Sequence, residues 1–212
     1  AAKGLKGMAA RQYERGLDAC DTVVTMGILD LLVLLVIWAF AARNLSPAPA
    51  FFGPPGSHLK TIRASVATYV ACFPWMFGLL WLAITVAGAL GIEPQVEAIH
   101  ELLFVEERPQ TLVLTVILAC LVGPVAEEFF FRGVIFGVLR RYSSRGLAIL
   151  GSSALFAAMH TNLIGFFPIV ALGALLAVLY ERHGSLAGSI AVHVLHNTFL
   201  VGLGLTAREL LL

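Results

Sequence analysis

The sequence has few charged residues and few cysteines, and both shortages exclude classes of protein. Only 13% of its 212 residues are Asp, Glu, Lys or Arg, whereas 59% are hydrophobic, which is not the composition of an ordinary soluble domain. The formal net charge of +1 offers no basic surface for nucleic acid. The three cysteines, Cys20, Cys72 and Cys120, have no C-x-x-C spacing, so neither a disulfide framework nor a zinc knuckle is indicated.

An internal repeat and a signal-peptide pattern are also missing. No segment repeats at a fixed period, which excludes the repeat architectures. The first strong apolar run begins only near Thr22 and contains Asp30, unlike the uncharged apolar core of a cleaved signal peptide. The apolar runs themselves are therefore the main guide to the fold.

Long apolar runs occupy most of the chain and predict an all-α, polytopic transmembrane helical bundle. A helix needs about 20 mostly apolar residues to cross a bilayer. The runs are expected at residues 22–42, 64–90, 110–141, 146–160, 163–180 and 185–205. We expect about six to eight membrane segments, a functional site inside the bilayer, and a multi-pass protein of a prokaryotic plasma membrane.

The pattern divides the chain into four parts. Residues 1–21 form a basic leader at the membrane interface, and residues 22–109 form a transmembrane region with a proline-rich loop and an acidic loop. Residues 110–205 form a core that carries most of the buried polar residues, and residues 206–212 are a tail. The basic residues from Arg140 to Arg145 and Arg182 favour a cytoplasmic side for that end of the core. The topology of the N-terminal region stays open.

Two carboxylates and an arginine stand inside an apolar segment, in the run Glu127-Glu128-Phe-Phe-Phe-Arg132. A charged side chain at the centre of a spanning helix costs about 2.5 to 3.5 kcal/mol, so such groups usually face a cavity and a partner. Glu128 and Arg132 are four residues apart and can pair on one helix face, while Glu127 points about 100° away. Glu127 is therefore available as a general base. The alternative is that all three form a salt-bridge cluster at the membrane surface.

Histidines in two other apolar segments add to this motif. His160 ends the run that contains Phe156, and it can share a water with Glu127. His193 and Asn197, four residues apart, can donate hydrogen bonds to one oxygen, as an oxyanion hole requires. Each histidine taken alone has the alternative role of a hydrogen-bonded packing residue. His196 lies off the shared face, and like Asp30 it has no role that the sequence assigns.

These motifs resemble those of the CAAX protease and bacteriocin-processing (CPBP or Abi) family of intramembrane glutamic-type proteases. The resemblance covers about residues 112–205 and is carried by Glu127-Glu128-x-x-x-Arg132, Phe156-x-x-x-His160 and His193-x-x-x-Asn197 in successive segments. It implies that Glu127 and His160 activate a water and that His193 and Asn197 stabilise the oxyanion. Glu128, Arg132 and Phe156 support them. Residues 110–205 would then be the catalytic core, acting on a membrane-anchored or lipidated peptide or protein.

Two alternatives accompany this interpretation. Zinc bound by Glu127, His160 and His193 is the less favoured one, because the H-E-x-x-H signature is absent and Asn197 is a poor zinc ligand. We therefore expect no metal or other cofactor. The second alternative is a non-catalytic protein, either a proton-coupled transporter or an immunity or scaffold protein. A transporter would more naturally show repeated halves with broken helices, and the sequence has none. The expected partners are the substrate and the lipid bilayer; substrate identity and oligomeric state stay open.

Overall fold

The computed structural model describes residues 21–22, 24–36, 39, 51–53, 56–92, 106, 108–160 and 162–211. Secondary structure within these ranges is helical, without strands. Residues 1–20 of the expected basic leader and the core of the expected acidic loop lie outside the described residues, as does most of the proline-rich loop. The all-α fold expected from the apolar runs is confirmed.

Each expected apolar segment corresponds to a helix. The helices are Val24–Val36, α3 (His58–Ala89), the continuous helix Pro109–Tyr142, α8 (Arg145–Met159), α9 (Phe166–His183) and α10 (Leu186–Leu211). The continuous helix comprises α5 (Pro109–Ile117), the π-helical stretch η1 (Leu118–Val122), α6 (Gly123–Glu128), the π-helical stretch η2 (Phe129–Phe136) and α7 (Gly137–Tyr142). Four of these are long and apolar enough to cross a membrane: α3, Pro109–Tyr142, α9 and the greater part of α10. The count of six to eight segments stays a prediction.

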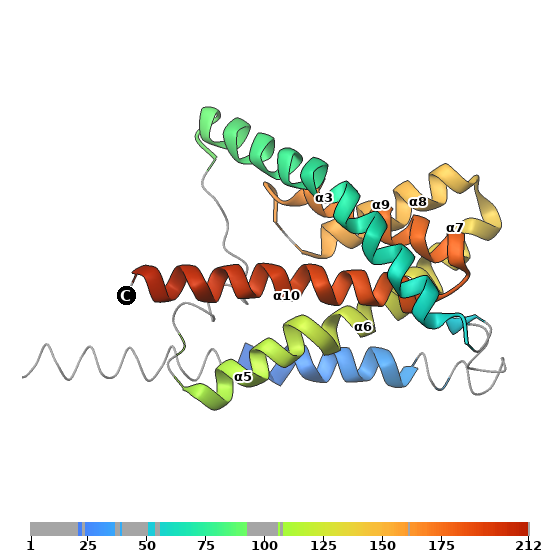
Figure 1. Ribbon diagram of the computed structural model, residues 1–212, viewed down its shortest axis with the longest axis horizontal. Coiled ribbons are helices and arrows are strands. Elements are labelled where there is room, and N and C mark those ends of the chain that lie inside the picture. The colour runs from blue at the N-terminus through green and yellow to red at the C-terminus, as the bar shows by residue number, and fades with distance from the viewer. Residues whose placement is uncertain are drawn as a thin grey trace, which may run out of the picture.

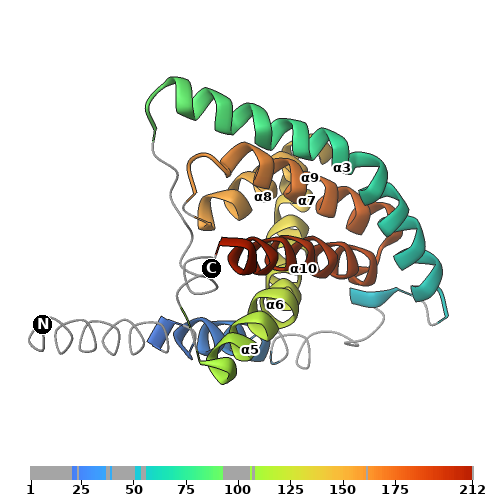
Figure 2. The same ribbon diagram turned by 60° about the vertical axis from the view of Figure 1, so that its left-hand side comes forward.

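Helix α10 lies in the middle of the bundle and contacts helices on both sides of it. Helix α3 runs over α9 and α10 on one side, and α5 lies beside the helix Val24–Val36 on the other (Figures 1 and 2). Helix α8 packs along α9, and α10 contacts α3, α9, α6 and η1. Residues of α10 are thereby brought against the acidic motif on α6.

The distribution of polar and apolar side chains is that of a membrane protein. Large apolar side chains face outward, among them Trp75, which is 84% exposed, and Trp81, while Glu128, Arg132 and His193 are buried. In lipid such an exterior carries no penalty, and polar groups must find partners inside the bundle. The expectation of an integral membrane protein is therefore confirmed.

Helices α10 and α3 approach each other closely at Gly188. A Cβ atom on this residue would overlap Ser65 Oγ and would lie 3.1 Å from Thr61 Cγ2. Small residues at such crossings let helix backbones pack closely in membranes. Gly184, four residues earlier, has a different function: it ends α9 with a φ of 57°, which favours glycine.

We expect Gly188→Ala to destabilise the protein by about 1 to 3 kcal/mol, because the added methyl overpacks the crossing. Thermal unfolding in detergent micelles measures the effect. The matched control is Gly202→Ala on the same helix, where a Cβ atom meets nothing within 4 Å. Adding the change Ser65→Gly to Gly188→Ala should restore stability. Equal stability of Gly188→Ala and Gly202→Ala would contradict the close approach.

Candidate active site

The acidic motif lies on α6, between the two π-helical stretches. In η1 the Gly123 N–H bonds to the Leu118 carbonyl, five residues earlier. In the same register the next residue, Pro124, would face the Ala119 carbonyl, but proline has no N–H to donate. Asn197 Nδ2 on α10 donates to this Ala119 carbonyl at 2.9 Å. Helix α10 is thus tied to the motif helix at the carbonyl that the proline leaves without its backbone partner.

Glu128 and Arg132 form a fully buried ion pair. Arg132 Nη1 lies 2.8 Å from Glu128 Oε1, and both side chains are at most 1% exposed. Arg132 Nη2 also donates to the Gly173 carbonyl on α9 at 3.1 Å, and its guanidinium carbon lies 4.6 Å from the centroid of the Phe156 ring. Buried charges require such additional partners to offset the loss of water. The i, i+4 pairing expected from the sequence is present.

His193 on α10 faces both carboxylates. Its Nδ1 lies 3.0 Å from Glu128 Oε1, and its Nε2 lies 3.6 Å from Glu127 Oε2. Because Glu128 is ion-paired with Arg132, its oxygens accept hydrogen bonds, and His193 Nδ1 must carry the donated proton. In a neutral His193, Nε2 is then an acceptor. Only the charged imidazolium has an N–H at Nε2 to offer to an oxyanion.

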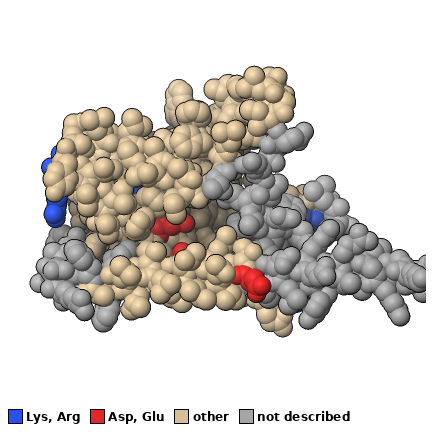
Figure 3. Space-filling view, turned by 180° about the vertical axis from the view of Figure 1, so that it is seen from behind, with Lys and Arg blue, Asp and Glu red and all other residues tan. Residues whose placement is uncertain are grey.

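Glu127 differs from Glu128 in having neither an arginine ion pair nor a hydrogen bond to His193, although each glutamate has a buried Oε2 without a hydrogen-bond partner. The Glu127 side chain is 33% exposed, yet Oε2 is buried and makes no hydrogen bond. The 3.6 Å to His193 Nε2 is longer than a hydrogen bond. A carboxylate oxygen of this kind can accept a proton, as a general base must. Figure 3 shows acidic atoms at the floor of a recess on one face of the molecule.

Phe156 lies between His160 and His193. Its ring is buried and lies with its centroid 4.8 Å from that of His160 and 5.6 Å from that of His193. His160 Nδ1 lies 2.9 Å from the Phe156 carbonyl, so Nδ1 donates and Nε2 is left as the acceptor. His160 and Glu127 share no recorded hydrogen bond. The described contacts therefore join His160 to the carboxylates only through the Phe156 ring.

His196 and Asp30, to which the sequence assigned no role, make contacts near this site. His196 Nδ1 lies 3.0 Å from the Tyr69 hydroxyl on α3, which adds a further hydrogen bond between α10 and its neighbours. Asp30 lies close to Gly123 and Glu127. Both contacts join residues about a hundred or more positions apart, so no spacing in the sequence indicates them.

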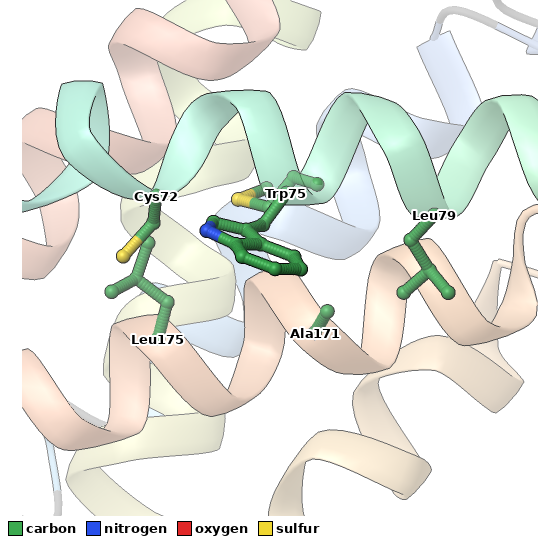
Figure 4. A pocket seen from close by; sticks show the side chains of 6 residues that line it. Cys72, Trp75, Leu79, Ala171 and Leu175 are labelled. Atoms are coloured by element: carbon green, nitrogen blue, oxygen red, sulfur yellow. The ribbon is translucent and has the colours of Figure 1, made fainter.

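Among the described residues, no three His, Cys, Asp or Glu side chains are gathered as metal ligands. The expectation of a site without metal stays a prediction. A cavity of about 340 Å³ lies between α3 and α9. Its lining is apolar, as Figure 4 shows: Cys72, Trp75, Met76, Leu79, Ala171 and Leu175. None of the polar site residues lines it.

Comparison with known proteins supports the resemblance drawn from the motifs. Residues 109–199 match the family model described as "Type II CAAX prenyl endopeptidase Rce1-like". A Bacillus subtilis (strain 168) protein named "Putative membrane peptidase YdiL" is 36% identical over 92 residues, which are 43% of this chain and 38% of that protein. The match thus spans well under half of the relative's length. No solved structure matches the chain.

Proposed function

We propose that this chain, similar over residues 109–199 to the Rce1-like CAAX prenyl endopeptidases, is an intramembrane endopeptidase. The observation that carries the proposal is the unlike treatment of two adjacent carboxylates. Arg132 neutralises the fully buried Glu128, whereas Glu127 has no ion pair with an arginine, is 33% exposed and lies beside His193. One acid is used for structure and the other is left for chemistry. The matched family and the name of the relative support the same reaction class.

In this mechanism Glu127 takes a proton from a water, and the resulting hydroxide attacks the carbonyl carbon of the scissile peptide bond. His160 helps to orient and deprotonate the same water through Nε2, since Nδ1 is held by the Phe156 carbonyl. The family resemblance assigns this role to His160. Substrate binding must bring the water between Glu127 and His160, because no hydrogen bond between them is recorded.

Negative charge then develops on the carbonyl oxygen of the substrate. Asn197 and a charged His193 are the proposed donors, and they lie four residues apart on α10. Charged His193 is stabilised by Glu128, which lies 3.0 Å from its Nδ1. Asn197 must turn its amide from the Ala119 carbonyl toward the substrate, or donate with its second N–H.

We further propose that the reaction uses no metal and that the substrate is a membrane-anchored or lipidated peptide or protein. The glutamate, the histidines and Asn197 supply base and oxyanion donors without a Lewis acid. The outward-facing apolar surface supports a substrate that lies in or on the bilayer, because such a surface is in contact with lipid. A prokaryotic plasma membrane is the proposed location, in line with the bacterial relative.

The test is a cleavage assay with the full chain reconstituted in liposomes. Candidate membrane-anchored peptides, with and without a prenyl group, are incubated with wild type and with His160→Ala, and the products are identified by mass spectrometry. We expect wild type alone to cut at a defined bond. Equal products from both proteins would contradict the catalytic assignment, and no cleavage by wild type would favour the non-catalytic alternatives. Activity that is lost in chelator and restored by zinc would overturn the metal-free mechanism.

Asn197→Ala is expected to lower kcat by about 10²- to 10³-fold with little change in KM, because an oxyanion donor acts in the transition state. Measuring kcat and KM in liposomes, together with the unfolding temperature, distinguishes a catalytic role of Asn197 from a structural one. If Asn197 serves only to hold the Ala119 carbonyl, the main effect is instead a loss of stability of about 1 kcal/mol. The control is Thr206→Ala on the same helix, whose hydroxyl bonds only to a carbonyl one turn earlier.

A further inference from the structure

Asp30, on the helix Val24–Val36, reaches the acidic motif of α6. A Cβ atom placed on Gly123 would lie 3.6 Å from Asp30 Oδ2 and 3.9 Å from Glu127 Oε1. The two carboxyl groups therefore both lie near the position that a side chain on residue 123 would occupy. Asp30 and Glu127 interact electrostatically.

A glycine allows the helix Val24–Val36 to pack closely against η1. Gly27 lies three residues before Asp30, so both face the same side of the helix. A Cβ atom on Gly27 would lie 3.3 Å from the Leu118 side chain in η1. Gly27 thus allows close packing against η1, and Asp30 then projects toward Gly123 and Glu127.

Three carboxyl groups, those of Asp30, Glu127 and Glu128, lie near two cations. Arg132 pairs with Glu128 at 2.8 Å, and the His193 that is charged in the proposed mechanism has its Nε2 3.6 Å from Glu127. Neighbouring carboxyl groups can hold one proton between them, as in the aspartic protease dyad. A pair that does so contains one base and one acid at the same time.

Resting on the proposed protease function, we propose that Asp30 is a further catalytic residue, the acid that protonates the leaving nitrogen. Glu127 takes a proton from water while the water oxygen bonds to the carbonyl carbon. The C–N bond breaks as Asp30 gives its proton to the nitrogen. Glu127 then returns its proton to Asp30, and the new carboxylic acid loses its own proton to solvent. Atoms and protons balance without another reactant.

The test compares two substrates that differ only in the leaving group. One carries the scissile peptide bond, and the other carries a phenyl ester at the same position, whose phenolate leaves without prior protonation. For Asp30→Asn we expect kcat on the peptide to fall by about 10²-fold or more at unchanged KM, with a far smaller loss on the ester. Asp30→Glu should recover part of the peptide activity. The matched control, expected to behave as wild type, is Asp21→Asn, an exposed acid at the start of the same segment.

An equal loss on peptide and ester, or no loss on either, would overturn the acid role. Infrared spectroscopy of the reconstituted protein at neutral pH tests the shared proton without any substrate. A band from a protonated carboxyl group should be present in wild type and in Asp21→Asn, and absent from both Asp30→Asn and Glu127→Gln. A spectrum that neither of the last two variants changes would refute the shared proton. If wild type cleaves neither substrate, the protease function fails, and the spectra still decide whether the pair exists.

Discussion

Glu127→Gln is expected to reduce peptide cleavage by about 10²- to 10⁴-fold, the range that a positioned general base contributes. The substitution keeps the size of the side chain but removes the oxygen that accepts a proton. Because Glu127 is one-third exposed and Oε2 has no hydrogen-bond partner, little stability should be lost with it. We therefore expect a fall in kcat with a nearly unchanged unfolding temperature.

Two variants decide whether Glu127 is the correct acid. Glu209→Gln, an exposed acid near the end of α10, should have wild-type activity and controls for the loss of a carboxylate as such. Glu128→Gln should lower stability, because Glu128 pairs with both Arg132 and His193. An active Glu127→Gln beside an inactive but stably folded Glu128→Gln would exchange the roles of the two acids.

Arg132→Ala is expected to destabilise the protein by about 3 to 5 kcal/mol, the cost of leaving one member of a buried ion pair alone. Glu128 would remain without its ion-pair partner inside the bundle, and the Gly173 carbonyl and the Phe156 ring would lose their contacts with the guanidinium. Unfolding by denaturant in mixed micelles gives the free-energy difference. Arg132→Lys should recover only part of it, because an ammonium group lacks the planar fork that serves these partners together.

The double variant Glu128→Leu/Arg132→Met identifies the origin of the effect. Removing both charges should restore much of the stability, since an apolar pair of similar volume often equals a buried ion pair. Arg141→Ala, at an exposed position on α7, should change stability little. A double variant as unstable as Arg132→Ala would show that shape and the contact with α9, rather than charge, account for the loss.

The sequence predicted those parts of the site that depend on one helix alone. Glu128 and Arg132 are four residues apart, and a single turn of helix suffices to foresee their pairing. The apolar runs likewise predicted helices, because an apolar run of about 20 residues is a property of one segment. The order of the motifs along the chain indicated the family, and the match of residues 109–199 confirms that resemblance over this segment.

Contacts between helices could not be predicted in the same way. His193 faces Glu128 and Glu127, because α10 packs across α6. Nothing in the spacing says which face of α10 meets which helix. The catalytic roles of these residues stay predictions until they are tested by mutation.

The local departure of the motif helix from α geometry was also beyond the sequence argument. Pro124 predicts a missing backbone donor, but the identity of the group that replaces it, Asn197, depends on tertiary packing. Gly123 similarly predicts room for a neighbour without naming Asp30. Pro124 and Gly123 therefore indicate where another group can approach the helix. Which group does so depends on the tertiary packing.

The two π-helical stretches have a consequence for insertions and deletions in the helix Pro109–Tyr142. Each wide turn accommodates one more residue than an α-helical turn, so losing a residue there could restore regular α-helix with every backbone bond intact. Because the extra residue is absorbed within one turn, its loss would leave the parts on either side nearly in register. After a deletion in η2 before Arg132, the arginine and Glu128 would be three residues apart and would still share a helix face. A deletion in one of the regular α-helical parts would instead turn the flanking parts by about 100° relative to each other. Single-residue deletions should therefore be tolerated better inside η1 and η2 than elsewhere in this helix.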